Sequence, residues 1–276
     1  MITPIFNKNK FTLYKNDCND VLSQLPESFD LIFADPPYLL YFPESFNLMF
    51  KSTPHIIHGN VVSVYNNKDS CLLSKKLNKI DEINHMDMFN MNWLKNAKTS
   101  LKSTGAILVS GTYHNIFSIG RCLLYLDFKI LNIITWKKID YYADKNTSVV
   151  FSMPEQIIFA CKNYDYIDKI LRNINSNNKE LIIETKLTQP WEKTQGNHPT
   201  QKPLSLLTRL ILMATKDDSI VCDPFSGSST TGIAANLIGR EFIGIEKEQE
   251  FIDISIRRKW ELDENFDNIK AKVADN

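Results

Sequence analysis

A short, nearly continuous apolar run, Phe29-Asp30-Leu31-Ile32-Phe33-Ala34, ends abruptly in Asp35-Pro36-Pro37-Tyr38. Such a run predicts a strand that is buried on both faces, as the strands of a parallel sheet are. Two successive prolines cannot continue the hydrogen-bond ladder, so the strand must stop and a loop must begin at Asp35. The sequence therefore predicts a buried parallel strand with an acidic and an aromatic side chain just beyond its carboxyl end.

Similar apolar runs alternate with segments of helical spacing along most of the chain. The predicted strands are Phe11–Lys15, Phe29–Ala34, Ala106–Ser110, Phe128–Trp136, Glu155–Cys161, Ser219–Cys222 and Phe242–Ile245. The predicted helices are Asp20–Leu25, Met86–Leu101, Ile116–Leu126, Pro203–Thr215, one that opens after a turn at 223–230 and ends near Ile238, and one from Lys247 to about Trp260. This alternation predicts an α/β fold with a mostly parallel sheet, in which ligands bind beyond the carboxyl ends of the strands.

Charge and cysteine content narrow the class of protein only slightly. The chain has 32 Lys plus Arg and 32 Asp plus Glu, so its formal net charge is zero. A local basic face can be offset elsewhere, so this balance neither supports nor excludes a nucleic-acid ligand. The five cysteines include no CxxC pair, which argues against a zinc site or a disulfide framework and for a reducing compartment. With no signal peptide and no membrane-spanning run, we expect a cytoplasmic protein that uses no metal and no membrane.

The Asp35–Tyr38 motif has the chemistry needed to activate an exocyclic amine on a nucleic-acid base. A proline-rich strand exit would explain Asp35 and one proline, but not a second proline followed by an aromatic ring. The lone pair of such an amine is delocalised into the base, which makes it a poor nucleophile. The Asp35 carboxylate and the stiffly held Pro36 carbonyl can accept both N–H hydrogens and stabilise the positive charge that develops on nitrogen. Tyr38 can stack on a base that has left the double helix.

A second turn, Asp223-Pro224-Phe225-Ser226-Gly227-Ser228-Ser229-Thr230, connects a strand to a helix. Gly227 lets the backbone approach a ligand closely, and the N–H groups at the helix start favour a carboxylate. Glu246 ends the following strand, where an acid can bind two ribose hydroxyls. The simpler alternatives are a strand–turn–helix with a Ser or Thr cap and a solvated acid at a helix start. A dinucleotide site is disfavoured because GxGxxG is absent.

Together the two motifs resemble those of β-class N6-adenine DNA methyltransferases. Asp-Pro-Pro-Tyr after a buried strand is similar to the family's catalytic signature, and Ile220–Ser228 is similar to its cofactor-binding turn. The catalytic motif precedes the cofactor motif, a permuted order that places the recognition region between them. Further blocks resemble those of the family, namely Asn16-Asp17-Cys18 with Leu25-Pro26, Gly111–Ile116, Ile134–Lys138, Asn197–Pro203 and Gly239–Glu246. The resemblance covers most of the chain apart from about 41–85 and 162–190.

The resemblance implies a Rossmann-like methyltransferase fold with a seven-stranded, mostly parallel sheet that contains an antiparallel strand, in one catalytic domain over 1–276. It also implies S-adenosyl-L-methionine (AdoMet) as cofactor and direct methyl transfer to the N6 amine of a flipped-out adenine in double-stranded DNA. The catalytic residues that it implies are Asp35, Pro36, Pro37 and Tyr38. The cofactor-binding residues that it implies are Asp17, Cys18, Asp35, Lys202, Asp223, Phe225, Ser226, Gly227, Ser228, Ser229, Thr230 and Glu246.

Ser229 differs from the family pattern, and His198 is a possible metal ligand. The family commonly has glycine where this chain has Ser229; a serine is tolerable there if the backbone keeps a negative φ, and its hydroxyl can then donate a hydrogen bond to the cofactor. His198 invites a metal interpretation, but no partner stands at ligand spacing. We therefore expect a hydrogen-bonded histidine instead.

The DNA-recognition surface is expected in two insertions, at about 39–85 and 137–197. We expect Lys137 and Lys138 to meet phosphates, and Tyr141 and Tyr142 to stack or wedge, although a solvated surface charge is the simpler interpretation of each lysine. The resemblance further implies a prokaryotic or phage-encoded protein. It is compatible with an orphan methylase or with a type II restriction–modification system that has a cognate restriction endonuclease, and with a homodimer.

Two other functions stay open. An N4-cytosine DNA methyltransferase performs the same chemistry on a similar amine, often with serine in place of the first aspartate, so Asp35 favours adenine without deciding the matter. A catalytically inactive DNA-binding subunit of a modification complex is disfavoured by the intact motifs at Asp35–Tyr38 and Asp223–Ser228.

Overall fold

The computed structural model describes residues 2–37, 56–57, 60–61, 79–139, 154–164 and 181–275. Its strands are β1 (Phe6–Lys8), β2 (Phe11–Lys15), β3 (Phe29–Ala34), β4 (Ile56–Ile57), β5 (Asn60–Val61), β6 (Leu101–Gly111), β7 (Lys129–Lys138), β8 (Glu155–Cys161), β9 (Ile182–Thr185), β10 (Ile220–Asp223) and β11 (Glu241–Glu246). Its helices are α1 (Cys18–Leu22), α4 (Lys79–Ser100), α5 (Ile116–Tyr125), the short 3-10 helix η1 (Pro190–Lys193), α7 (Leu204–Ala214), α8 (Thr230–Leu237), α9 (Gln249–Glu264) and α10 (Phe266–Ala274).

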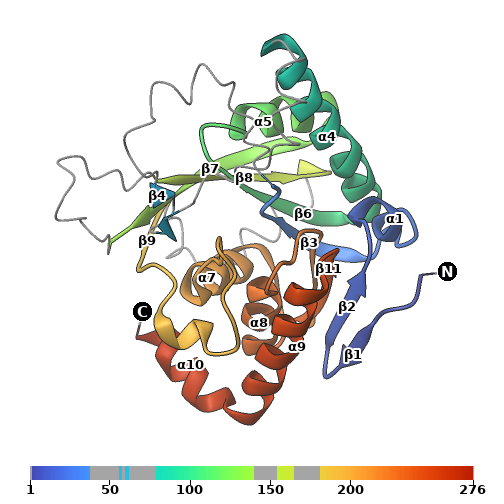
Figure 1. Cartoon of the computed structure of the whole chain (residues 1–276). Helices are drawn as coiled ribbons and strands as arrows, with labels where there is room; N and C mark the ends of the chain where they lie inside the picture. The colour runs from blue at the N-terminus through green and yellow to red at the C-terminus, as the bar shows by residue number, and fades with distance from the viewer. Residues whose placement is uncertain are drawn as a thin grey trace, which may run out of the picture.

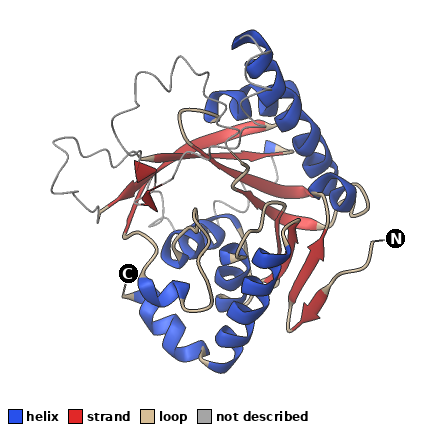
Figure 2. Cartoon of the chain, in the orientation of Figure 1, coloured by secondary structure: helices blue, strands red, loops and turns tan. Residues whose placement is uncertain are grey.

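One mixed sheet of nine strands crosses the described part of the molecule, in the order β1-β2-β11-β10-β3-β6-β8-β7-β9. Strands β2, β11, β10, β3 and β6 are parallel to one another. Strand β8 is antiparallel to both β6 and β7, and β9 is parallel to β7. Figure 2 shows these strands in red between layers of helix, so the fold is a three-layer α/β arrangement.

The helices divide between the two faces of the sheet. Helices α1, α4 and α5 cover one face, and α7, α8, α9 and α10 lie on the other (Figure 1). The buried side chains form two clusters that match these layers. Because successive side chains of a strand point to opposite faces, Ile32 of β3 belongs to the first cluster and Phe33 to the second. The apolar run of β3 is therefore buried on both sides, as its composition predicts.

Polar groups from many strands meet at one edge of the sheet. Parallel strands bring their carboxyl ends together, so the residues that follow β2, β3, β10 and β11 share this edge. Strand β8 runs the other way and therefore begins here, with Glu155 opposite Trp136 and Gln156 opposite Gly111. The topology thus gathers the ends of distant segments into the candidate site.

The predicted α/β fold is confirmed, but the number of strands and the extent of the helices are corrected. The sheet has nine strands rather than seven, because the edge strands β1 and β9 have only three and four residues and give no clear periodic signal. Helix α1 begins at Cys18 rather than Asp20, since the side chain of Asp17 caps it by accepting a hydrogen bond from the N–H of Asn19. Helix α4 begins at Lys79 rather than Met86, and α10 was not predicted because its sequence is strongly charged.

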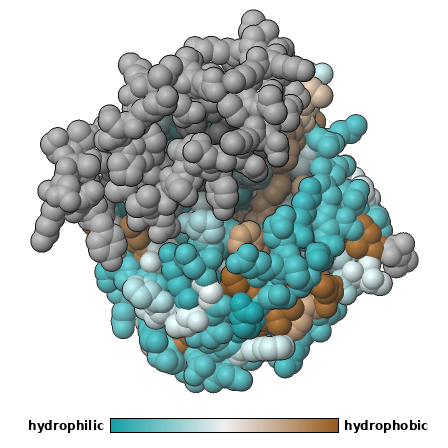
Figure 3. Space-filling view, viewed as in Figure 1, coloured by the Kyte–Doolittle hydropathy of each residue, from teal (hydrophilic) through white to brown (hydrophobic). Residues whose placement is uncertain are grey.

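The longest described helix, α4, carries many polar residues, and no helix in the described ranges is long and apolar enough to cross a membrane. The described surface in Figure 3 is largely hydrophilic, with apolar residues in smaller patches. Most of the large apolar side chains are therefore enclosed between the sheet and its helices.

We predict that Gly232→Ala destabilises the protein, although alanine is normally the better helix former. Gly232 lies in α8, where a Cβ atom would stand 2.3 Å from Cδ1 of Phe242 and 2.6 Å from Cε2 of Phe11. Helix propensity favours alanine by about 1 kcal/mol, whereas overpacking a buried contact costs roughly 1–3 kcal/mol. We therefore expect urea unfolding to show a net loss of stability.

Gly120→Ala in α5 is the matched control for this change. Its Cβ atom would meet only Cδ1 of Ile158, at an ordinary contact distance of 3.5 Å. We expect this variant to gain up to about 1 kcal/mol in the free energy of unfolding. If both alanine variants moved the unfolding midpoint in the same direction, the packing argument for Gly232 would be wrong.

Candidate active site

A cavity of about 500 Å³ opens at the edge where the strand ends meet. Its walls come from the loops after β2 and β3, from the block 198–202 before α7, and from the turns after β10 and β11. Its lining includes Asp17, Cys18, Asp35, Pro37, His198, Lys202, Asp223, Phe225, Ser226, Gly227, Ser228, Thr230, Glu246 and Phe251. The fold therefore brings both sequence motifs to one cavity.

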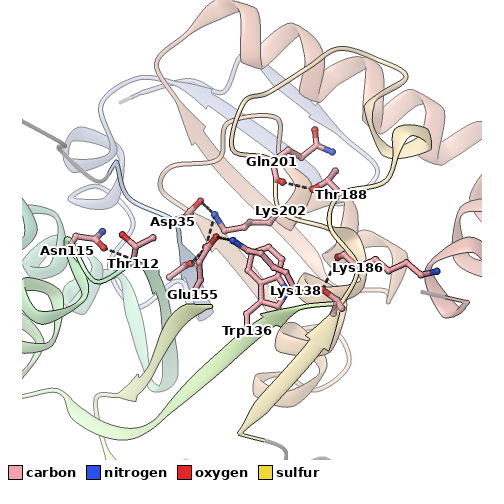
Figure 4. A network of polar contacts seen from close by, with 12 residues as sticks. Asp35, Thr112, Asn115, Trp136, Lys138, Glu155, Lys186, Thr188, Gln201 and Lys202 are labelled. Carbon is pink, nitrogen blue, oxygen red and sulfur yellow. Dashed lines mark hydrogen bonds and ion pairs between the residues drawn. The ribbon is translucent and has the colours of Figure 1, made fainter. Parts of the chain in front are cut away.

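Four charged side chains of alternating sign form a network beside this cavity (Figure 4). The ammonium group of Lys202 contacts Oδ2 of Asp35 and lies 3.4 Å from Oε2 of Glu155. The second carboxylate oxygen of Glu155, Oε1, is 2.9 Å from Nζ of Lys138. The side chains of Lys138, Glu155 and Lys202 are 7%, 1% and 6% exposed, so water screens these charges only weakly. The formal charge of the four groups sums to zero.

Asp35 is the most exposed member of this network, at 18% of its side chain, and it lines the cavity. It follows the last residue of β3, and Pro36 behind it is buried. Proline fixes its own φ and so restricts the path of the chain as it leaves the strand. The Asp35 carboxylate is therefore held from two sides, by the backbone and by Lys202.

The turn after β10 places backbone close to the cavity. Gly227 has a φ of +50°, a conformation that favours glycine, and a Cβ atom there would stand 2.8 Å from Nε2 of His198. The N–H of Gly227 donates to Oε2 of Glu246 at 2.7 Å. Helix α8 begins directly beyond the turn, and the first N–H groups of a helix have no partner within it. This end of α8 is suited to an anionic group.

The condition of a negative φ at Ser229 is not met. Its φ is +54° and its ψ is +38°, in the left-handed region that costs a residue other than glycine roughly 1–2 kcal/mol. The side chain is fully buried, and its Oγ lies 2.7 Å from Oγ of Ser226. The serine hydroxyl is therefore bonded within the turn and lies away from the cavity lining.

Two acids, Asp17 and Glu246, also line the cavity. The carboxylate of Glu246, at the end of β11, accepts the N–H of Lys247 at 2.7 Å with its Oε1. Oδ2 of Asp17 is 2.5 Å from Nζ of Lys247. Burial raises the pKa of Asp17, but the hydrogen bonds from Lys247 and Asn19 outweigh it, so the pKa lies below its ordinary value. Asp17 and Glu246 are therefore fixed acceptors on either side of Lys247.

The ring of His198 lies against Gly227 of the turn. Its ring packs against Phe251 of α9 in a T-shaped contact with centroids 4.3 Å apart. Its Nδ1 accepts a hydrogen bond from the N–H of Thr200 at 3.4 Å, which confirms the expected hydrogen-bonded histidine. Burial lowers the pKa of His198 to about 4, so the ring is neutral near pH 7.

Comparison with known proteins places this site in a family. The family model described as DNA methylase, which covers N6 and N4 methyltransferases, matches residues 29–257 and so includes both motifs. The chain belongs to this DNA methylase family. It is 40% identical over 277 residues to the type II methyltransferase M2.MboI of Moraxella bovis, a match that covers 95% of this chain and 92% of that protein. It is 38% identical over 267 residues to M2.DpnII of Streptococcus pneumoniae, covering 94% and 92%.

Solved DNA methylases share the fold. The PvuII DNA methyltransferase, described as cytosine-N4-specific, superposes with a TM-score of 0.67 at 18% identity, covering 99% of this chain and 95% of that one. M1.HpyAVI, solved as a complex with SAM, gives a TM-score of 0.61 at 23% identity, covering 90% and 98%. The methyltransferase architecture predicted from the motifs is thereby confirmed.

Nearly all predicted cofactor-binding residues of this DNA methylase lie together in the cavity lining, and Ser229 is the exception. Cys18 lines the cavity as a thiol, because burial raises its pKa to about 12. Of the predicted catalytic residues, Asp35 and Pro37 line the cavity and Pro36 is buried behind them. Tyr38 lies outside the described residues.

The two lysines predicted to contact DNA have different surroundings in the methylase. Lys137 is 60% exposed, with its Nζ 2.7 Å from Oε1 of Glu184. Lys138 points to the opposite face of the strand, where it is buried and its ammonium pairs with Glu155, so the expectation that it meets a phosphate is corrected. Tyr141 and Tyr142 lie outside the described residues.

Sequence reasoning missed two features of the methylase site. Glu155 carried a weak signal, since it is an acid at the start of an otherwise apolar strand. The second feature is an aromatic wall, in which Phe225 packs against Trp93 of α4 with centroids 5.2 Å apart and against Phe89 at 6.0 Å. Phe89 and Trp93 fall within the predicted helix Met86–Leu101, but nothing local indicated which loop they would support.

We predict that ionisation of Asp223 makes the methylase less stable as the pH rises. Asp223 is buried, its Oδ1 accepts from the N–H of Phe225 and its Oδ2 accepts from the hydroxyl of Thr231. Burial raises the pKa of Asp223 from 3.8 to about 7. A carboxyl group with a raised folded-state pKa contributes stability that is fully present below its unfolded pKa and is lost as the pH rises through the folded pKa. The loss therefore falls between about pH 4 and about pH 7.

Asp223→Asn keeps a side chain of the same shape and should remove this dependence. Urea unfolding across the window should show wild type losing roughly 1 kcal/mol per pH unit relative to the variant. His198 acts with the opposite sign, because a lowered histidine pKa costs stability on acidification, but both proteins contain it, so it cancels in the comparison. Parallel pH profiles for the two proteins would show that Asp223 does not titrate in this range.

Proposed function

We propose that this methylase transfers a methyl group from AdoMet to the N6 amine of a flipped-out adenine in double-stranded DNA. The observation that carries the proposal is the Asp35 carboxylate, held by Lys202 in the wall of the same cavity that the cofactor turn lines. AdoMet supplies the methyl group, and the chain supplies the groups that hold and activate the amine. Flipping is required because the amine is paired inside the duplex.

The chemistry of the cavity supports AdoMet as its ligand. A volume of about 500 Å³ lies within the range of small-molecule sites. The N-terminus of α8 suits the methionine carboxylate, Glu246 suits the ribose hydroxyls, and Asp17 suits the adenine amine. M1.HpyAVI was solved with SAM, and the putative DNA modification methylase TTHA0409 of Thermus thermophilus was solved with S-adenosyl-L-methionine. These complexes support the same cofactor here.

Asp35 and the Pro36 carbonyl are proposed to make the target amine reactive. Each accepts one N–H hydrogen, which draws the nitrogen toward a tetrahedral form and stabilises its developing positive charge. Lys202 orients the Asp35 carboxylate, and Tyr38 is proposed to stack on the flipped base. Transfer is direct, without a covalent bond between the chain and the base.

Adenine is the preferred target because Asp35 carries a full negative charge. N4-cytosine methyltransferases often have serine at this position, which is a weaker acceptor for a developing ammonium. The fold does not distinguish the two substrates, since the solved PvuII enzyme is cytosine-N4-specific. The assignment to adenine therefore depends on Asp35.

We propose that the whole chain is one catalytic domain and that its DNA contacts come from the insertions at about 39–85 and 137–197. Exposed Lys137 remains a candidate for a phosphate contact. The type II designation of M2.MboI and M2.DpnII supports a role in a restriction–modification system, beside an endonuclease that cuts the same sequence. A homodimer is a further proposal on the same grounds of resemblance.

Product analysis tests the proposed reaction. Purified protein is incubated with methyl-labelled AdoMet and unmethylated genomic DNA, and the DNA is digested to nucleosides. We expect label in N6-methyladenine. Label in N4-methylcytosine would overturn the adenine assignment but keep the methyl transfer, and an absence of label in either nucleoside would contradict the proposal.

A further inference from the structure

The left-handed serine at position 229 raises the question of what holds the turn in its shape. Glycine adopts this conformation without steric cost, whereas serine adopts it only at a steric cost. The side chain of Ser229 makes no capping hydrogen bond to α8, so helix capping does not offset this steric cost. Besides the hydrogen bonds within the turn and the one from Gly227 to Glu246, the turn has contacts from a more distant element.

Helix α9 supplies these contacts from behind the turn. Ser255 donates its hydroxyl to the carbonyl of Gly227 at 3.0 Å. Nη1 of Arg258, one turn further along α9, donates to the carbonyl of Ser228 at 2.7 Å, to its Oγ at 3.1 Å and to Oγ1 of Thr230 at 2.7 Å. Ser255 and Arg258 are 0% and 4% exposed, so water cannot replace these contacts.

The direction of these hydrogen bonds matters for the cavity. A trans peptide unit is planar, with its C=O and N–H on opposite sides. Drawing the carbonyl of Gly227 toward α9 therefore directs the N–H of Ser228 away from α9, and Ser228 lines the cavity. The hydrogen bonds from α9 thus determine that the turn directs the backbone N–H of Ser228, and not the carbonyl of Gly227, away from α9.

Arg258 is coupled electrostatically to the carboxylates of Glu192 and Glu261, but its direct contacts are with the turn. Across the described residues, no carboxylate lies within ion-pair distance of its guanidinium, and every hydrogen bond that it makes goes to Ser228 or Thr230. Burial lowers the pKa of Arg258 to about 10, which reflects the cost of keeping this charge away from water. A buried arginine that bonds only to the cofactor turn points to a function at that turn.

We propose that Arg258 is a positioning residue for AdoMet binding, and that the cofactor turn requires it because position 229 is serine rather than glycine. This inference rests on the proposed function, since it assumes that the turn binds AdoMet. Arg258 offsets the strain of Ser229 by cross-linking the residues on either side of it. A turn with glycine at 229 would need this support much less.

A double-mutant cycle between the two positions tests the coupling. Wild type, Arg258→Met, Ser229→Gly and the double variant are each measured for AdoMet Kd by equilibrium dialysis with labelled AdoMet. We expect Arg258→Met to raise the Kd at least about tenfold in wild type and less than about threefold in the Ser229→Gly background. In steady-state assays the same change should raise the KM for AdoMet and leave kcat and the KM for DNA nearly unchanged, which general destabilisation would not do.

Arg257→Met is the matched control, because Arg257 is the neighbouring residue on α9, is exposed and, among the described residues, donates only to the carbonyl of Gln195. It should leave the AdoMet Kd unchanged. If Arg258→Met does not fold, the cycle is run with Arg258→Lys, which keeps the charge and is expected to retain part of the affinity. Equal effects of the Arg258 change in both backgrounds, or no effect in either, would overturn the inference. Failure of wild type itself to bind AdoMet would instead overturn the proposed function.

Discussion

Asp35→Asn should lower the rate of methyl transfer by roughly 10²–10³-fold even when AdoMet and DNA are saturating. The amide has the shape of the carboxylate but not its charge, and one of its two ends is a donor. It therefore stabilises a developing ammonium poorly and also loses the ion pair with Lys202. Single-turnover assays with saturating AdoMet and DNA would measure the chemical step, and equilibrium dialysis would measure cofactor affinity.

Asp30→Asn offers a matched control on the same strand. Asp30 also pairs with a lysine, since Nζ of Lys102 lies 2.8 Å from its Oδ2, but it is not among the residues that line the cavity. Any effect of that variant should appear in stability and not in the single-turnover rate. A rate for Asp35→Asn within threefold of wild type would rule out Asp35 as the group that activates the amine.

Glu155→Gln should both destabilise the methylase and slow methyl transfer. Removing the negative charge leaves two buried ammonium groups, those of Lys138 and Lys202, with the single carboxylate of Asp35. Breaking a buried charge pair in this way costs roughly 3–5 kcal/mol. Lys202 would also be drawn wholly to Asp35 and would compete with the target amine for its carboxylate oxygens, so we expect kcat to fall by roughly 10-fold or more.

A double variant should regain part of the stability that Glu155→Gln loses. Adding Lys138→Met to Glu155→Gln removes one positive and one negative charge together, so the remaining pair of Lys202 and Asp35 is neutral again. Urea unfolding should therefore show the double variant to be more stable than Glu155→Gln alone. If the two changes simply added their costs, the four groups would not behave as one electrostatic network.

The catalytic and cofactor strands could be predicted because their signals are local. Each is an apolar run that ends in a motif whose prolines, acids and glycine constrain the chain within a few residues, as at Asp35 and Asp223. Parallel strands then place such ends at a common edge, so the meeting of the two motifs followed from the fold class. These parts of the site required no knowledge of side-chain packing.

The remaining parts depend on contacts between distant segments. Glu155 is 120 positions from Asp35, and its partners are set by the antiparallel register of β8 against β6 and β7. Lys138 is internal, although Lys137 beside it is exposed, because a strand alternates its faces. The left-handed backbone of Ser229 is stabilised by a helix that follows it by some twenty residues. No pattern within a short window carries this information.

The pairing of β2 with β11 has a consequence for how the enzyme is made. β2 lies between β1 and β11, and more than two hundred residues separate Lys15 from Glu241 along the chain. At translation rates of about 5–20 residues per second, roughly 10–45 s pass between synthesis of these strands. Asp35 is made early in that interval and Lys202 near its end, whereas Glu246, Ser255 and Arg258 have yet to be translated when it closes. In the proposed function cofactor capture is therefore a late event in biogenesis, because a chain that ends before α9 has Asp35 and the turn after β10 but lacks Ser255 and Arg258.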